Sequence, residues 1–253
     1  LDEEGGEDPG QCSTKKIKVD VSDYDETRQM LQQFEAYATE LDDKHNRFER
    51  IVKFGRDITI ESKRIIFLLH TIDKKSNRES VLHEADMRLQ KLAKTLFKSI
   101  ALELKDLDPY LYLKAYRNGL EEYIEAVTFY QYLKCGNIKK WAEIQKTLSY
   151  KEPESSRIDN IRVIISPYEY ILGIADLTGE LMRLCINDLA IGDTASCFKT
   201  CNFVRDMHGH GLKRINNNTI NEIMFVSFYL VINFNIVKIF IKYIISIFSF
   251  FLY

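Results

Sequence analysis

Residues 118–133, NGLEEYIEAVTFYQYL, decide the fold of this chain, because they form a helical pattern that is apolar on nearly every side. Such a helix is typical of the interior of a bundle, where other helices surround it. Two acids, Glu122 and Glu125, nevertheless lie among its apolar residues. An ionised carboxylate in an interior position is costly unless it is paired or holds a metal ion. The stretch therefore predicts an interior helix whose acids need a cationic partner.

Helical spacing continues through most of the 253 residues, which contain only 4 Pro and 11 Gly. Phe34, Tyr37 and Leu41 illustrate the spacing of three and four that places apolar side chains on one helix face. No alternating pattern is long enough to build a sheet. We therefore expect an all-α fold, a bundle of six to seven helices. The predicted helices span residues 23–53, 58–72, 79–104, 109–134, 138–148, 167–189 and 195–206.

Two of the predicted helices have clear start signals. Asp108 followed by Pro109 provides an N-cap and a first-turn proline, and Ser166 and Pro167 repeat this arrangement with Glu169 as the last residue of a capping box. Between these helices, residues 149–160 are predicted to form a polar surface loop, followed by a short extended piece at residues 161–165.

Composition divides the chain into three parts. Residues 1–22 are expected to form a disordered polar tail, and residues 23–207 the helical domain. Residues 208–253 form an anomalous apolar tail, rich in Phe, Ile, Lys, Asn and Tyr, whose codons can be built from A and T alone. This bias favours a read-through or gene-model artefact. The alternative is a membrane segment, but Lys238 and Lys242 would make it a poor one, so membrane binding is disfavoured.

The charge balance of 35 Lys and Arg against 37 Asp and Glu argues against a strongly basic nucleic-acid binder, so any polyanion site must be a local patch. The 5 cysteines include no CxxC pair, and their odd number argues against a disulfide framework. A reducing compartment is therefore expected. Cys197 and Cys201 share a helix face, where the role of small apolar residues is favoured over metal binding.

Acidic pairs occur on two of the predicted helices. Glu122 and Glu125 lie about 60° apart on a helical wheel, and Asp176 and Glu180, in ADLTGELMR, lie about 40° apart. Two helices that each present two carboxylates can make a four-carboxylate cage for a hard divalent cation, Mg²⁺ or Mn²⁺. Such ions activate water and stabilise the charge that develops on a phosphate, as in metal-dependent nucleases.

Spacing alone favours a plainer interpretation, in which the second acidic pair belongs to a solvent-exposed helix face and Glu121 and Glu122 share a wet edge. A di-iron carboxylate site is disfavoured because both helices lack the Glu-x-x-His motif. The stripe at helical spacing that supports the solvent-face interpretation consists of Glu169, Gly173, Asp176, Glu180, Arg183 and Asn187.

Other chemical signals are weaker. His208 and His210 lie where the composition turns anomalous, and His45 and His70 are expected at the surface or the core edge. No Walker, GxGxxG or GxSxG motif supports a nucleotide-binding site or a serine hydrolase. Four basic residues are candidates for contacts with nucleic-acid phosphates, although a solvated helix face is the favoured interpretation: Arg56, Lys63, Arg64 and Arg183.

Three stretches together resemble the translin family, and within it the TRAX-like subunits. They are residues 41–70, LDDKHNRFERIVKFGRDITIESKRIIFLLH, residues 118–133, and residues 167–187, PYEYILGIADLTGELMRLCIN. The resemblance covers residues 30–206 in the same order and spacing, and the chain is expected to depart from the family after about Met207. It implies an all-α translin-like fold and a hetero-oligomer with translin that surrounds RNA.

The same resemblance implies a function. TRAX-like subunits supply the Mg²⁺-dependent endoribonuclease activity of the complex with translin, which removes passenger strands during activation of the RNA-induced silencing complex. The family's catalytic acids correspond here to Glu122, Glu125, Asp176 and Glu180. Single-stranded RNA is the expected substrate, with single-stranded DNA as a second ligand, and the expected location is the cytoplasm and nucleus. The alternative is a non-catalytic RNA-binding or scaffold partner of translin, since the C-terminal departure removes the family's final helix.

Overall fold

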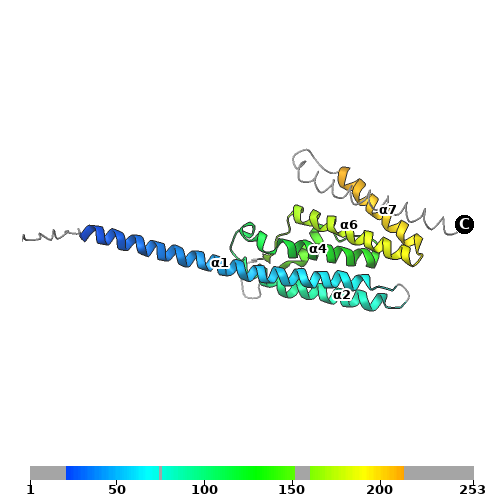
Figure 1. Cartoon of the computed structure of the whole chain (residues 1–253), viewed down its shortest axis with the longest axis horizontal. Coiled ribbons are helices and arrows are strands. Elements are labelled where there is room, and N and C mark those ends of the chain that lie inside the picture. Colours follow the sequence, from blue (N-terminus) through cyan, green and yellow to red (C-terminus); the bar gives the residue numbers. More distant parts are fainter. Residues whose placement is uncertain (1–20, 74–75, 152–159, 214–253) are drawn as a thin grey trace, which may run out of the picture. The chain divides into compact units, whose positions relative to one another are not determined.

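The computed structural model describes residues 21–73, 76–151 and 160–213, which are almost entirely helical (Figure 1). This confirms the all-α prediction. A short antiparallel pair, β1 (Ser149–Lys151) and β2 (Asn160–Arg162), is the sheet in this part of the chain. The α-helices are α1 (Val21–His70), α2 (Arg78–Leu92), α3 (Lys98–Glu103), α4 (Leu113–Cys135), α5 (Trp141–Thr147), α6 (Pro167–Ala190) and α7 (Thr194–Lys213).

The prediction of two separate helices at residues 23–53 and 58–72 is wrong, because α1 is one continuous helix. Gly55 lies between the two predicted helices, the helix continues through it, and its missing side chain allows a close approach to α4. A Cβ atom on Gly55 would lie 2.7 Å from the carbonyl oxygen of Ala115 in α4. The chain divides into two compact units at residues 46 and 47. In the first unit the predicted apolar stripe is helical, but Phe34, Tyr37 and Leu41 are exposed.

The predicted helix starts are realised differently from the expectation. Asp108 caps a 3₁₀ turn, Pro109–Leu111, by accepting a hydrogen bond from the backbone N–H of Tyr110 at 3.0 Å, and α4 begins only after it. The predicted helix at 79–104 consists of α2, a π-helical turn (Ala93–Phe97) and α3.

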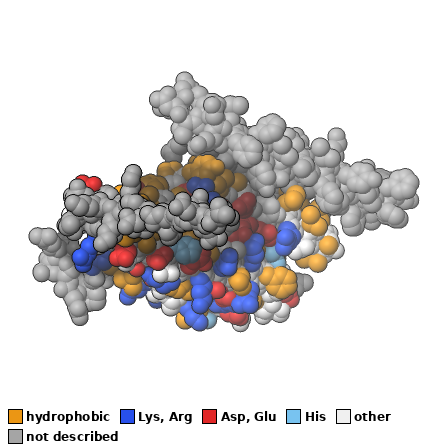
Figure 2. All heavy atoms as spheres, turned by 60° about the vertical axis from the view of Figure 1, so that its left-hand side comes forward, with side chains coloured by type: hydrophobic (Ala, Val, Ile, Leu, Met, Phe, Trp, Pro, Cys, Tyr) orange, Lys and Arg blue, Asp and Glu red, His pale blue; other side chains and the backbone are white. Residues whose placement is uncertain are grey.

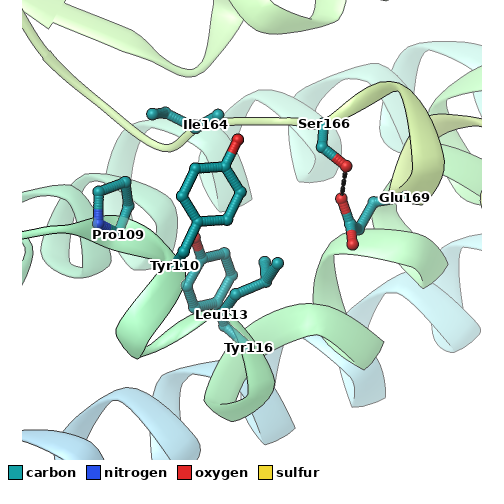
Figure 3. A pocket seen from close by; sticks show the side chains of 7 residues that line it. All are labelled: Pro109, Tyr110, Leu113, Tyr116, Ile164, Ser166 and Glu169. Atoms are coloured by element: carbon teal, nitrogen blue, oxygen red, sulfur yellow. Dashed lines mark hydrogen bonds between the residues drawn. The ribbon is translucent and has the colours of Figure 1, made fainter.

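Helix α6 starts at Pro167 as predicted, but the capping box does not form. The Ser166 hydroxyl donates to the Glu169 carboxylate instead of accepting from the backbone (Figure 3). Glu169 is 1% exposed and pairs with Arg117 Nη2 of α4 at 3.1 Å. The side chain that was expected to cap α6 therefore ties α6 to α4.

Helix α4 runs through the middle of the second unit, as the sequence predicted. It lies between the paired helices α1 and α2 and helix α6, and α7 packs on α6 (Figure 1). Tyr116, Leu120, Tyr123, Ile124 and Phe129 of α4 are each at most 2% exposed. Burying such large apolar side chains contributes on the order of 1.5–3 kcal/mol each, so α4 is the centre of the core.

Two glycines let neighbouring helices approach α4 closely. A Cβ atom on Gly119 would lie 2.6 Å from the carbonyl oxygen of Gly55 in α1. A Cβ atom on Gly173 of α6 would lie 2.7 Å from Ile124 Cγ2 and 2.9 Å from the Glu121 carbonyl oxygen. The axes of α1 and α6 are therefore brought toward α4 at these points, which decides which side chains meet beyond them.

Among the described residues, no helix has the length and apolar character that a membrane crossing requires. The predicted tail at 1–22 lies outside these residues apart from its last two positions, and so does the apolar tail from residue 214 onward. Helix α7 extends to Lys213 and therefore continues past the domain boundary predicted at residues 207 and 208.

We expect Gly173→Ala to lower the free energy of unfolding by about 1–3 kcal/mol, because the added methyl group overpacks the contact between α4 and α6. Urea denaturation measures this change. Gly179→Ala is the matched control on the same helix, since a Cβ atom there meets nothing within 4 Å. It should stabilise the protein by roughly 0.5–1 kcal/mol through helix propensity. Equal effects of the two substitutions would contradict the proposed role of Gly173.

Candidate metal centre

The two predicted acidic pairs lie on neighbouring helices that pack along their length. Glu122 and Glu125 follow Gly119 on α4, and Asp176 and Glu180 follow Gly173 on α6. The negative charges of Glu122, Asp176 and Glu180 all act on Glu125. The structure thus brings together the four acids that the sequence singled out.

The solvent-face interpretation is wrong for the first part of the stripe on α6. Glu169 and Gly173 are buried against α4, whereas Asp176 is exposed and Glu180 is partly exposed. The stripe passes from the interior to the surface, and the acidic cluster lies at this transition. Its carboxylates are therefore partly desolvated yet reachable from solvent.

Glu125 is the most deeply buried of the four acids, at 7% exposure. Burial, and then the charges of Glu122, Asp176 and Glu180, raise the pKa of Glu125 to about 8, against a smaller opposing effect of Lys63. Partial desolvation and the charge of Glu122 also raise the pKa of Asp176. In the described part of the chain, the carboxylates of Glu125 and Asp176 have no hydrogen bond or ion pair. Two oxygen-donor groups are thus without a cationic partner of their own.

Lys63 of α1 lies within the acidic cluster. Its Nζ atom is 2.5 Å from Glu122 Oε1. The hydrogen bond to Glu122, together with the charges of Glu122, Glu125 and Asp176, raises the pKa of Lys63. This residue was a candidate for phosphate contacts, and here its ammonium group neutralises part of the acidic cluster.

His70, at the end of α1, is a residue of the site that the sequence analysis missed. Its side chain is only 8% exposed, its Nε2 atom is 2.6 Å from Glu180 Oε2, and its ring packs on Phe129 at 4.8 Å between centroids. Burial would raise the pKa of Glu180, but the hydrogen bond with His70 and the charges of Arg183, His70 and Lys63 lower it below its ordinary value. No local pattern connects residues 110 positions apart, so spacing held no signal for this pair.

Glu121 is a fifth carboxylate beside the cluster, not a member of a wet edge. It is half-buried, and its Oε1 atom has no hydrogen-bond partner in the described structure. Burial raises the pKa of Glu121 to about 7, with contributions from Asp176, Glu169 and Glu122 and an opposing effect of Arg117. The excess of negative charge thus extends along α4 toward its N-terminal end.

Of the four basic candidates, two lie at the cluster. Arg183 Nη2 is 3.5 Å from Glu180 Oε1, as Lys63 is close to Glu122. Arg64 pairs with Glu61 instead, and Arg56 is exposed. Figure 2 shows basic and acidic side chains intermingled on one face of the molecule. The local basic charge around the cluster therefore comes from Lys63 and Arg183.

The other histidines that the sequence analysis considered lie in the first unit and on α7. His45 is exposed in the first unit, in agreement with the sequence. His208 and His210 belong to α7, but their side chains lie outside the described residues.

The residue types of the cluster fit a hard divalent cation, because carboxylate oxygens are the ligands that Mg²⁺ and Mn²⁺ prefer. Unpaired Glu125 and Asp176 carboxylates favour such an ion electrostatically. The arrangement is open: among the described residues, no three of these acids have ligand atoms that all lie within 4.8 Å of one another. Lys63 and His70 each hold one carboxylate, so a bound ion would compete with both.

A profile of the translin family matches residues 46–224. The chain belongs to the translin family. Similar proteins are Translin-associated protein X of Pongo abelii, 38% identical over 69% of this chain, and of Mus musculus, 34% identical over 81%. The Schizosaccharomyces pombe homologue is 30% identical over 71% of this chain. The alignments cover 64%, 77% and 71% of these relatives, so the chain spans just under two thirds of the Pongo abelii protein.

Solved structures support the translin-like fold. The crystal structure of apo-NeC3PO superposes with a TM-score of 0.61 at 20% identity, covering 85% of this chain and 96% of that one. The complex of AfC3PO with duplex RNA superposes with a TM-score of 0.58 at 16% identity, covering 81% and 93%. The family match to residue 224 also continues beyond Met207, where the sequence analysis expected the similarity to end.

We expect Glu125→Gln to stabilise the metal-free protein at alkaline pH. Between the ordinary pKa of 4.5 and about 8, folded Glu125 keeps a proton that the unfolded chain releases, so the free energy of unfolding falls as pH rises. The amide removes this titration, and the variant should gain on the order of 1–2 kcal/mol at pH 8 relative to pH 4.

Urea denaturation in the presence of EDTA at both pH values measures the gain. Glu143→Gln, at an exposed acid of α5 outside the cluster, is the control for a Glu-to-Gln substitution. A Glu125→Gln effect that does not depend on pH would show that folding does not raise the pKa of this carboxyl group.

Proposed function

We propose that the chain is the catalytic subunit of an endoribonuclease complex with translin, and that it cleaves single-stranded RNA with Mg²⁺. One observation carries the proposal: the four acids at the family's motif positions meet in one solvent-accessible cluster on α4 and α6. The family's cytoplasmic and nuclear location and its role in passenger-strand removal are part of the same proposal.

Family membership and the relatives named Translin-associated protein X support this assignment. AfC3PO shares this fold at 16% identity and binds duplex RNA in its solved complex, which is why RNA is the ligand in our proposal. Because that complex contains duplex RNA, the preference for single strands, and single-stranded DNA as a second ligand, need a direct test.

Glu122, Glu125, Asp176 and Glu180 would hold Mg²⁺, or Mn²⁺, through their carboxylate oxygens. When bound, the cation supplies a means of activating water and of neutralising charge on the scissile phosphate. Because Glu125 must lose its proton to act as a ligand, protons compete with cation binding below a pH of about 8. The Oε2 atom of Glu180 contacts His70 Nε2, and this contact holds the carboxylate in position.

Lys63 has a further role in this proposal. Its long side chain is 62% exposed, and its ion pair with Glu122 is the contact that a bound cation would weaken. The released ammonium group would lie beside the cluster and could then contact an RNA phosphate. Arg183, 60% exposed beside Glu180, offers a second such contact.

A non-catalytic RNA-binding or scaffold partner of translin is the second candidate. The observation that favours it is the occupancy of two of the four acids by Lys63 and His70, at 2.5 and 2.6 Å. If no cation displaces these contacts, the cluster is an internally neutralised part of the fold.

We expect the chain, co-expressed with translin, to cleave labelled single-stranded RNA in Mg²⁺ and to lose cleavage in EDTA. Glu125→Ala and Asp176→Ala should each reduce the cleavage rate by at least about 10²-fold, because each removes a proposed ligand of the ion. Glu143→Gln should retain activity, since this exposed acid lies outside the cluster. Parallel reactions with duplex RNA and single-stranded DNA define the substrate.

Full activity of Glu125→Ala or Asp176→Ala would show that the cluster is not the catalytic site. An assembled complex that binds RNA but does not cleave it in Mg²⁺ or Mn²⁺ would favour the scaffold function.

A further inference from the structure

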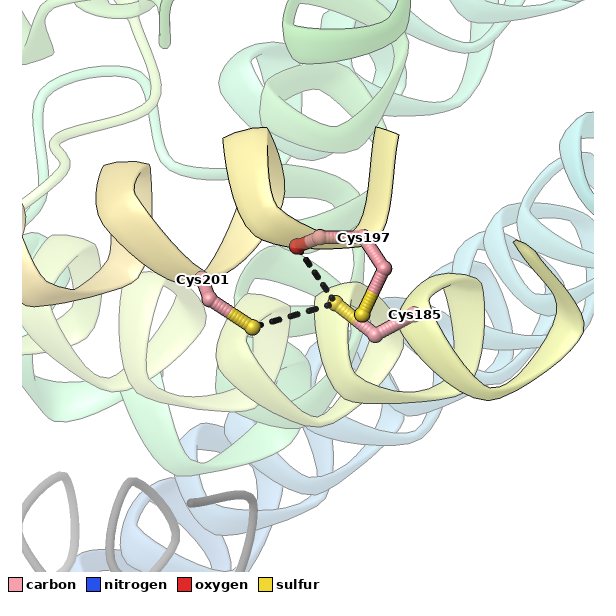
Figure 4. Close-up of side chains that lie close together, drawn as sticks. All are labelled: Cys185, Cys197 and Cys201. Carbon is pink, nitrogen blue, oxygen red and sulfur yellow. Dashed lines mark hydrogen bonds between the residues drawn. The ribbon is translucent and has the colours of Figure 1, made fainter. Parts of the chain in front are cut away.

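Three cysteine side chains converge between α6 and α7. Their sulfur atoms all lie within 4.8 Å of one another, and Cys185 Sγ of α6 is 3.9 Å from Cys201 Sγ of α7 (Figure 4). Cys185 and Cys197 are each 2% exposed, whereas Cys201 is partly exposed. Among the described residues, this is the group of three or more His, Cys, Asp or Glu side chains whose ligand atoms lie close enough together to hold one metal ion.

The sequence showed only two of these cysteines as neighbours. Cys197 and Cys201 lie one helical turn apart on α7, while Cys185 lies on α6, before the turn that contains Gly192. Gly192 adopts a φ of 80°, which reverses the chain so that α7 packs back on α6. The third thiol therefore joins the pair only in the folded protein.

The sulfur spacing suits a metal bound by thiolates. A tetrahedral ion with bonds of about 2.3 Å to sulfur separates its ligands by about 3.8 Å, close to the 3.9 Å between Cys185 and Cys201. A lone disulfide would use two of the sulfurs and leave the third without a role. Cys201 faces partly toward solvent, which leaves an approach for the ion and for a fourth ligand such as water.

The packing of α7 on α6 gives such an ion a structural purpose. The apolar cluster at this contact contains Leu189 and the three cysteines, apart from the main core. Helix α7 also contacts α4, where the Tyr132 hydroxyl donates to Thr200 at 2.8 Å and the Tyr132 ring packs on Phe203. Phe203, Val204 and Met207 of α7 pack against the main core farther along the helix, so an ion at the cysteines would add an attachment near the start of this 20-residue helix.

We propose that Cys185, Cys197 and Cys201 bind one zinc ion that fastens α7 to α6. Zinc suits sulfur ligands, whereas the hard cation of the acidic cluster suits oxygen, so the two sites select different ions. The proposal does not depend on the proposed ribonuclease function, because it rests on a different helix contact and on different ligands.

Cobalt substitution of the full-length chain, purified under anaerobic reducing conditions and stripped of metal, tests the site. Titration with Co²⁺ should produce a sulfur-to-cobalt charge-transfer band that saturates at about one ion per chain and disappears on addition of Zn²⁺. Oxygen ligands of the acidic cluster give no such band. Cys185→Ser should abolish the band, and Cys135→Ser should retain it, because Cys135 is exposed and outside the cluster.

A second measurement uses the unsubstituted chain, so that misfolding of a variant does not decide the outcome. Zn²⁺ should slow alkylation of Cys201 by about tenfold or more and leave alkylation of Cys135 unchanged, as read by mass spectrometry. Absence of the charge-transfer band, its persistence in Cys185→Ser, or equal alkylation of Cys201 with and without Zn²⁺ would each overturn the proposal. So would a disulfide between Cys185 and Cys201 in the metal-free protein kept under reducing conditions.

Discussion

The close contact between α4 and α6 at Gly173 controls the chemistry of this protein. Because a side chain at this position would clash with Ile124 and with the Glu121 backbone, the two helices approach to a distance that only glycine permits. The acids that follow on each helix are then held face to face. The equivalent contact between Gly55 and Gly119 draws α1 toward α4 and delivers Lys63 and His70 to the same place.

This packing concentrates negative charge where hydration is reduced. The fold tolerates the repulsion in three ways: Lys63 pairs with Glu122, His70 pairs with Glu180, and Glu125 keeps its proton well above the ordinary pKa of a carboxylic acid. Such an arrangement is costly for stability and is typical of functional sites, where groups are held ready for a ligand. A divalent cation, a proton and the Lys63 ammonium group are alternative ways to neutralise the same charge.

Helix α6 serves two chemically different contacts. Glu180 faces the acidic cluster, and Cys185, five residues later, lies about 140° around the helix and faces α7. Oxygen donors thus collect on the side of α4, and sulfur donors on the side of α7. Both sets include residues of α6. The attachment of α7 and the position of the acids therefore depend on the same helix.

Local signals in the sequence were sufficient for the all-α fold, the interior position of α4, the two acidic pairs and the family. Periodicity and motif resemblance are properties of short stretches of sequence, and they do not depend on tertiary contacts. Local signals failed where a residue's role depended on a distant neighbour. Helix α1 was predicted as two helices, Glu169 was predicted to complete a capping box but pairs with Arg117, and the solvent-face interpretation of the α6 stripe fails at its buried first part.

The contacts of His70 with Glu180 and of Cys185 with the pair on α7 existed only after the helices had packed. The sequence by itself therefore determined which chemical groups the protein carries and on which helices they lie. Tertiary structure decided which of these groups meet, because that depends on helix separations set by steric contacts between residues far apart in the chain.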